Sequence, residues 1–174
     1  MADMTSLLVN AAGAAPAMLD LLAIVAQTTG VIIIGQSIYR AMAVSAGKAH
    51  HTHVGLFTNK FFGVVLFSLP GFMSGLAGDM GISGAGGFNS LLSHMPGGGA
   101  ELSQKSMDAI NAALTLLRVF GVFAVFKGIL MWKRAADGQG NNEEVMRGTV
   151  HVVGGVMLAN AGAVLASVAA WLLA

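Results

Sequence analysis

The chain has 174 residues, of which 55% are hydrophobic and 10% charged, and its formal net charge is +1. A soluble domain carries about 25% charged residues, so these proportions exclude an ordinary water-exposed surface and indicate a lipid environment. The chain has no cysteine, which excludes a disulfide framework and a thiolate metal site.

The first apolar run covers roughly residues 18–39 and contains no Lys or Arg before Arg40. The second covers residues 61–76 and is extended by neutral residues on both sides. A membrane helix needs about 20 mostly apolar residues, so the second run spans only if those neighbours are included. No basic region precedes a short apolar core at the N-terminus, and we therefore expect no secretory signal.

The third apolar run covers residues 109–132 and includes Arg118 and Lys127, whereas the fourth, residues 150–173, has no charge after Arg147. Unpaired backbone groups are costly in hydrocarbon, so each spanning run is expected to be helical. The sequence therefore predicts an all-α membrane protein with four hydrophobic helices, arranged as two tandem helical hairpins.

The segment between the second and third runs is rich in Gly, Ser and Asn and includes Gly97, Gly98 and Gly99. This composition is typical of a loop or a short broken helix. We accordingly divide the chain into three parts. They are an N-terminal helical hairpin (1–80), a Gly-rich connector (81–105) and a C-terminal helical hairpin (106–174).

The two halves resemble each other when the chain is shifted against itself by 91 residues without gaps. Four pairs of glycines then coincide: Gly30 with Gly121, Gly47 with Gly138, Gly63 with Gly154, and Gly71 with Gly162. The polar residues Gln27 and Gln36 meet Arg118 and Lys127. The common spacing favours an internal duplication.

Basic residues gather beside the short loop of each predicted hairpin, and the two ends of the chain carry none. By the positive-inside rule, both loops face the cytoplasm and the termini face the periplasm. Tyr39 and Trp132 suit an aromatic belt at the inner surface, and Trp171 suits one at the outer surface. We expect seven cations to face a lumen or lipid head groups: Arg40, Lys48, Lys60, Lys127, Lys133, Arg134 and Arg147.

Arg118 lies inside the third apolar run, where a cation costs several kcal/mol unless it is paired, snorkels or meets water. One interpretation is a contact with a lipid phosphate, a carboxylate or a pore. The other is a shorter, tilted helix in which Arg118 reaches an interface. Asn111 precedes Arg118 by seven residues and shares its helical face, and Gln27 matches it in the repeat. These three residues are the candidate intramembrane polar contacts. Lys127 is expected to snorkel to the cytoplasmic surface.

Two spacings of small residues suit close helix packing: Gly71 with Gly75, and Gly155 with Ala159. They predict contacts within the chain or between subunits. His50, His51 and His53 lack the acidic or thiolate partners of a closed metal shell, so we predict no metal site. The carboxylates lie at predicted helix ends or loops and not as a pair buried in a helix, and no phosphate-binding glycine loop is visible, so we expect no enzyme.

The third and fourth runs carry a distinctive pattern, residues 117–128 followed by residues 147–160 with His151-x-x-Gly154-Gly155 and then Asn160. This pattern resembles small membrane proteins of type IVB secretion and conjugation systems, namely the TraQ-type transfer proteins and the DotE(IcmC) and DotP(IcmD) proteins. The hairpins also resemble the conjugative pilins of the VirB and F-type systems. The resemblance implies a role in DNA or effector transfer.

The leading hypothesis is a pilin-like structural subunit that polymerises with phospholipid into a conjugative pilus or channel. The alternatives are a scaffold of the same apparatus that never leaves the inner membrane, and a small transporter. The expected partners are copies of itself, other type IVB secretion components and membrane phospholipid, with transferred DNA or protein contacted only indirectly. No cofactor is expected beyond structural phospholipid. The expected location is the bacterial inner membrane, and an extracellular pilus after assembly.

Overall fold

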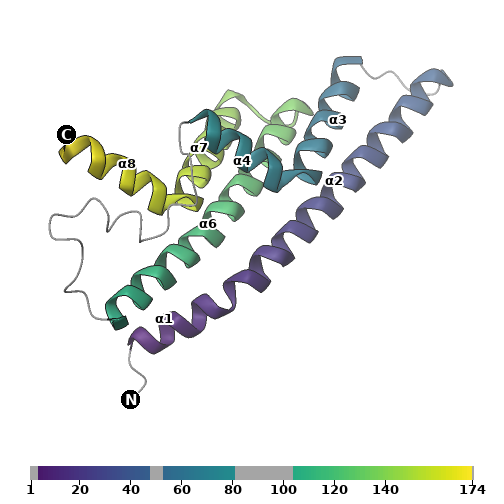
Figure 1. Cartoon of the computed structure of the whole chain (residues 1–174). Helices are drawn as coiled ribbons and strands as arrows, with labels where there is room; N and C mark the ends of the chain where they lie inside the picture. Colours follow the sequence, from purple (N-terminus) through teal and green to yellow (C-terminus); the bar gives the residue numbers. More distant parts are fainter. Residues whose placement is uncertain (1–3, 48–52, 81–103, 174) are drawn as a thin grey trace.

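The computed structural model describes residues 4–47, 53–80 and 104–173 (Figure 1). These residues form α-helices and no strand, which confirms the all-helical fold class for this part of the chain. Lys48, His50, His51 and nearly all of the predicted connector lie outside the described residues. The helices are α1 (Met4–Gly13), α2 (Ala15–Ser45), α3 (His53–Phe67), α4 (Leu69–Asp79), α6 (Gln104–Ala136), α7 (Asn142–Ala159) and α8 (Ala161–Leu173).

Each of the two long helices packs against the shorter helix that follows it, and glycines bring the two backbones together. In the α2–α3 pair, a Cβ added to Gly30 would lie 2.6 Å from the carbonyl oxygen of Gly63. In the α6–α7 pair, a Cβ added to Gly121 would lie 2.6 Å from the carbonyl oxygen of Gly155. Gly128 and Gly148 form a second close approach of the same kind. The absence of side chains at these positions therefore determines how closely the helices pack.

The connection between α6 and α7 has defined ends. Gly138 has φ of 76°, and the Gln139 and Gly138 N–H groups donate to the carbonyl oxygens of Arg134 and Ala135 at 3.1 Å each. This is a Schellman motif, which satisfies the last carbonyls of a helix. α7 then begins with the Asn141 side chain, whose oxygen accepts from the backbone N–H of Glu144 at 3.0 Å, as a helix N-cap does.

Both shorter helices end at a sharp bend, which the sequence does not predict. The axis turns by 90° at Ser68, between α3 and α4, and by 78° at Asn160, between α7 and α8. Pro70 in the first turn of α4 lacks the N–H that would continue α3. At Asn160 the side-chain amide donates to the carbonyl oxygen of Val156 at 2.9 Å, and this local bond competes with a continuous helix.

The positions of the two bends show that the halves do not correspond at one constant offset of 91 residues. Gly47 and Gly138 both have positive φ and are 91 residues apart. Ser68 and Asn160, however, are 92 residues apart, and so are Gly63 and Gly155, which occupy matching contacts. Gly63 therefore corresponds to Gly155 and not to Gly154, beside which the structure leaves open space. The second half therefore has one more residue than the first between Gly138 and Gly155. The shared contacts support the predicted duplication.

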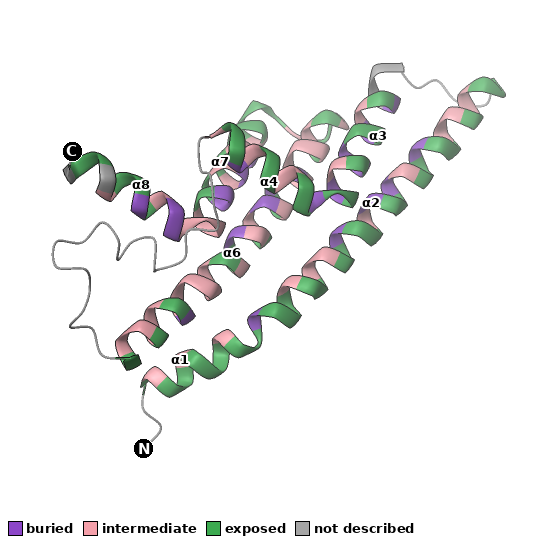
Figure 2. Ribbon diagram, viewed as in Figure 1, coloured by how far each residue is buried: buried purple, intermediate pink, exposed green. Residues whose placement is uncertain are grey.

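One buried cluster joins the two helix pairs. It contains residues from α2, α3, α4, α6 and α7, with Leu66, Val125 and Val156 each 0% exposed. The outer faces are different: Figure 2 shows α1 and α2 mostly exposed, and only 17% of the most apolar stretch of Met4–Ser45 is buried. Among the described residues, two helical stretches, Met4–Ser45 and α6, are long and apolar enough to cross a membrane, or up to four if each bent pair is one span.

Candidate functional site

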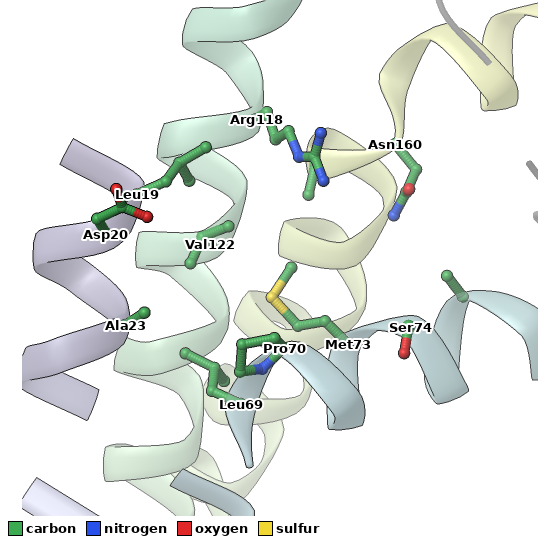
Figure 3. A pocket seen from close by; sticks show the side chains of 12 residues that line it. Leu19, Asp20, Ala23, Leu69, Pro70, Met73, Ser74, Arg118, Val122 and Asn160 are labelled. Carbon is green, nitrogen blue, oxygen red and sulfur yellow. The ribbon is translucent and has the colours of Figure 1, made fainter. Parts of the chain in front are cut away.

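A cavity of about 300 Å³ lies where the two bends approach each other (Figure 3). Leu69 and Pro70 at the first bend and Ala159 and Asn160 at the second contribute to its wall. α2 and α6 close the other side, with apolar residues that include Val122. The cavity therefore depends on both bends, because straight α3–α4 and α7–α8 helices would not bring these residues together.

Among the described residues, four polar side chains line this cavity: Asp20 from α2, Ser74 from α4, Arg118 from α6 and Asn160 from the bend between α7 and α8. In Figure 3 the Asp20 carboxylate projects from α2 toward α6, and the Arg118 guanidinium extends toward Asn160. Asp20 and Arg118 share a cavity wall without forming an ion pair, because the ion pairs of the described chain are Lys133–Asp137 and Arg147–Glu143.

Two of these polar side chains form hydrogen bonds within their own part of the chain, and two do not. Asn160 already uses its amide N–H on Val156, and the Ser74 hydroxyl donates to the Gly71 carbonyl at 2.9 Å. Asp20 and Arg118 have no hydrogen-bond or ion-pair partner among the described residues. The cavity thus presents one free carboxylate and one free guanidinium, which can bind a cationic and an anionic group respectively.

Of the three candidate intramembrane polar contacts, one lies at the cavity. Arg118 lines the cavity, whereas Asn111 and Gln27 are exposed and lie outside it. Arg118 instead shares the cavity with Asp20 and Asn160, which the sequence analysis did not assign to a site. Asp20 could have been identified from the sequence, because it is an ionisable residue within an apolar run. Such residues mark functional positions in membrane helices.

α2 and α6 end, and α3 and α7 begin, at one end of the described part of the molecule (Figure 1), and Arg40, Lys60, Lys133, Arg134 and Arg147 belong to these parts of the helices. Lys127 lies further along α6, and Lys48 lies outside the described residues. Two of the predicted cations are paired locally: Lys133 with Asp137 at 2.5 Å, and Arg147 with Glu143 at 2.6 Å. Arg134, Lys60 and Lys127 are exposed and Arg40 is half-buried. Among the described residues, these four are the predicted cations that have no ion-pair partner.

The predicted packing residues fall into two groups. Gly155 and Ala159 lie directly against Gly121, so they pack within the chain. Around Gly75 there is no other residue within 4 Å of an added Cβ, and at Gly71 there is only the Ser68 hydroxyl. For Gly71 and Gly75, contact with another subunit stays a prediction.

Within the described residues, no group of three or more His, Asp or Glu side chains could hold a metal ion. Comparisons with protein-family models, with curated proteins and with solved structures give no match.

Proposed function

We propose that this chain is a pilin-like structural subunit of a type IVB conjugation or secretion apparatus, which polymerises with phospholipid into a pilus or channel. The observation that carries the proposal is the apolar surface that the chain leaves uncovered. Large hydrophobic side chains such as Leu21, Ile24 and Ile32 on α2 are 53–63% exposed. Lipid covers such a surface in a membrane, and neighbouring subunits together with lipid would cover it in a filament.

The helix lengths suit two hairpins that cross a bilayer. α2 and α6 have 31 and 33 residues, or about 46 and 50 Å at 1.5 Å per residue, which exceeds a hydrocarbon layer of about 30 Å. α3 and α7 have 15 and 18 residues, or about 22 and 27 Å, enough to return across most of it. α4 and α8 would then leave the crossing direction at the opposite surface.

The charge distribution supports an orientation for these hairpins. The basic ends of the two pairs would face the cytoplasm while the chain resides in the inner membrane, and α1 would lie on the periplasmic side. After assembly, Arg40, Lys60 and Arg134 would turn toward a lumen, where they could contact transferred nucleic acid or protein through charge alone.

A small transporter is a second candidate, favoured by the two bends. Broken helices with polar groups gathered between them are typical of transporter binding sites. The bends at Ser68 and Asn160 and the cavity beside Asp20 and Arg118 have these two features. A scaffold that stays in the inner membrane is the third candidate, and it differs from the pilin only in whether the chain polymerises.

The location of the chain distinguishes these candidates. We expect filaments sheared from the surface of bacteria that express the apparatus to contain this chain as a major component, together with phospholipid. The measurement is mass spectrometry and lipid analysis of the purified filaments, with sheared material from cells lacking the gene as the control. Retention of the chain solely in the inner membrane of cells that carry filaments would contradict the pilin proposal and favour the scaffold.

A further inference from the structure

We infer that the cavity at the two bends binds the zwitterionic head group of an ethanolamine phospholipid. In this arrangement Asp20 binds the primary ammonium group and Arg118 binds the phosphate. The inference rests on the membrane placement proposed above and adds the class of lipid that this one site selects.

The first argument is charge complementarity. Asp20 and Arg118 line the same cavity and neither has an ion-pair partner among the described residues. An uncompensated charge next to lipid is costly, and a ligand that carries both opposite charges satisfies both residues at once. An anionic phospholipid would satisfy Arg118 but would leave Asp20 beside a second negative charge.

The second argument is depth in the bilayer. Asp20 precedes Arg40 by 20 residues of α2, a rise of about 30 Å. Arg118 precedes Arg134 by 16 residues of α6, a rise of about 24 Å. With the basic ends at the cytoplasmic surface, both side chains reach the opposite side of a hydrocarbon layer of about 30 Å. Lipid phosphates and amines lie at that level, so Arg118 need not be a charge at the bilayer centre.

The third argument is the composition of the wall. Leu19, Ala23, Val122 and Met73 supply apolar surface beside the charged groups, as the glycerol and upper acyl chains of a lipid require. None of the described residues that line the cavity is aromatic. Quaternary ammonium groups are recognised by aromatic rings, whereas a primary ammonium group donates hydrogen bonds to a carboxylate. The wall therefore suits ethanolamine better than choline.

The test uses the purified full chain in nanodiscs that contain equal amounts of phosphatidylethanolamine, phosphatidylcholine and phosphatidylglycerol. Lipids retained by the protein are measured by native mass spectrometry. We expect phosphatidylethanolamine to be enriched at least tenfold over each of the other two in the native chain. Asp20→Asn should reduce the enrichment of phosphatidylethanolamine over phosphatidylglycerol. Arg118→Gln should reduce the retained amount of all three lipids, because each carries the phosphate that Arg118 binds.

Matched controls lie on the same or a neighbouring helix. Lys105→Gln removes an exposed cation from α6, and Asp108→Asn removes an exposed carboxylate from the same helix, both outside the cavity. Both variants should retain the native enrichment, and the conservative variants Asp20→Glu and Arg118→Lys should restore part of it. These comparisons separate loss of the site from general unfolding, because every variant is tested in the same nanodiscs.

Three results would overturn the inference. Equal retention of the three lipids by the native chain would mean that Asp20 and Arg118 are neutralised in another way, and preferential retention of phosphatidylglycerol would mean that Arg118 alone selects the ligand. A third arm adds soluble glycine at millimolar concentration, and displacement of phosphatidylethanolamine by glycine would reassign the cavity to a soluble zwitterion. None of these outcomes depends on filament formation. A chain that does not insert into nanodiscs at all would instead contradict the proposed function.

Discussion

Gly155→Val is expected to destabilise the chain by about 3 kcal/mol, at the upper end of the usual cost of overpacking. A Cβ at Gly155 would lie 2.7 Å from the Gly121 carbonyl oxygen and 2.9 Å from the Val125 backbone nitrogen. Backbone atoms of a long helix cannot move aside as a side chain can, so α6 and α7 must separate. The measurement is the free energy of unfolding in mild detergent.

The neighbouring residue provides the control for that substitution. Gly154 lies on the same helix with nothing within 4 Å of an added Cβ, so Gly154→Val should change the free energy of unfolding by less than about 0.5 kcal/mol, as is usual for a surface substitution. Equal effects of the two variants would contradict the assigned packing. A larger effect of Gly154→Val on filament yield than on unfolding would indicate that Gly154 contacts another subunit.

Trp132→Ala is expected to cost about 3 kcal/mol, the lower end of the range for removal of a well-packed tryptophan. The Trp132 indole N–H donates to the Val145 carbonyl and to the Thr149 hydroxyl, both at 3.2 Å, and the ring covers Gly148. These contacts connect the end of α6 to the start of α7. Loss of the ring removes both hydrogen bonds and leaves space between the helices.

Trp171 is the matched control, because it is the only other tryptophan of the chain and is 79% exposed. In detergent, Trp171→Ala should lower the free energy of unfolding by much less than Trp132→Ala does. The sequence analysis assigned both residues to aromatic belts. If both substitutions changed the free energy of unfolding by a similar, small amount, Trp132 would be a residue of the aromatic belt and would have no role in helix packing.

The helical class could be predicted from sequence because it follows from a general constraint. Apolar runs such as residues 18–39 and 109–132 cannot leave backbone groups unpaired in lipid, and they lie within α2 and α6. Hydrophobicity does not, however, report where a helix bends. The runs that contain Ser68 and Asn160 stay apolar across the bend, so their breaks depend on Pro70 and on one side-chain hydrogen bond.

The candidate site was only partly predictable for a related reason. Arg118 is conspicuous as a cation within an apolar run, so the sequence alone makes it a candidate. Its neighbours in the cavity come from α2, α4 and the second bend, and their meeting depends on helix packing between distant segments. Spacing along α6 places Asn111 on the same helical face as Arg118, but it cannot indicate Asp20, which lies on another helix. Two acidic residues near the α6–α7 connection are paired locally, since Asp137 binds Lys133 and Glu143 binds Arg147.

The side of the membrane on which each connection lies tests the central claim most directly. The chain has no native cysteine, so single cysteines can be placed at exposed positions: Ala46→Cys and Gln139→Cys beside the two connections, and Met4→Cys and Gln104→Cys at the other end. With a membrane-impermeant maleimide applied from the periplasm, we predict labelling of the Met4→Cys and Gln104→Cys variants. The other two should react only after the inner membrane is permeabilised. Labelling of Ala46→Cys or Gln139→Cys with the inner membrane intact would contradict two hairpins with a common orientation.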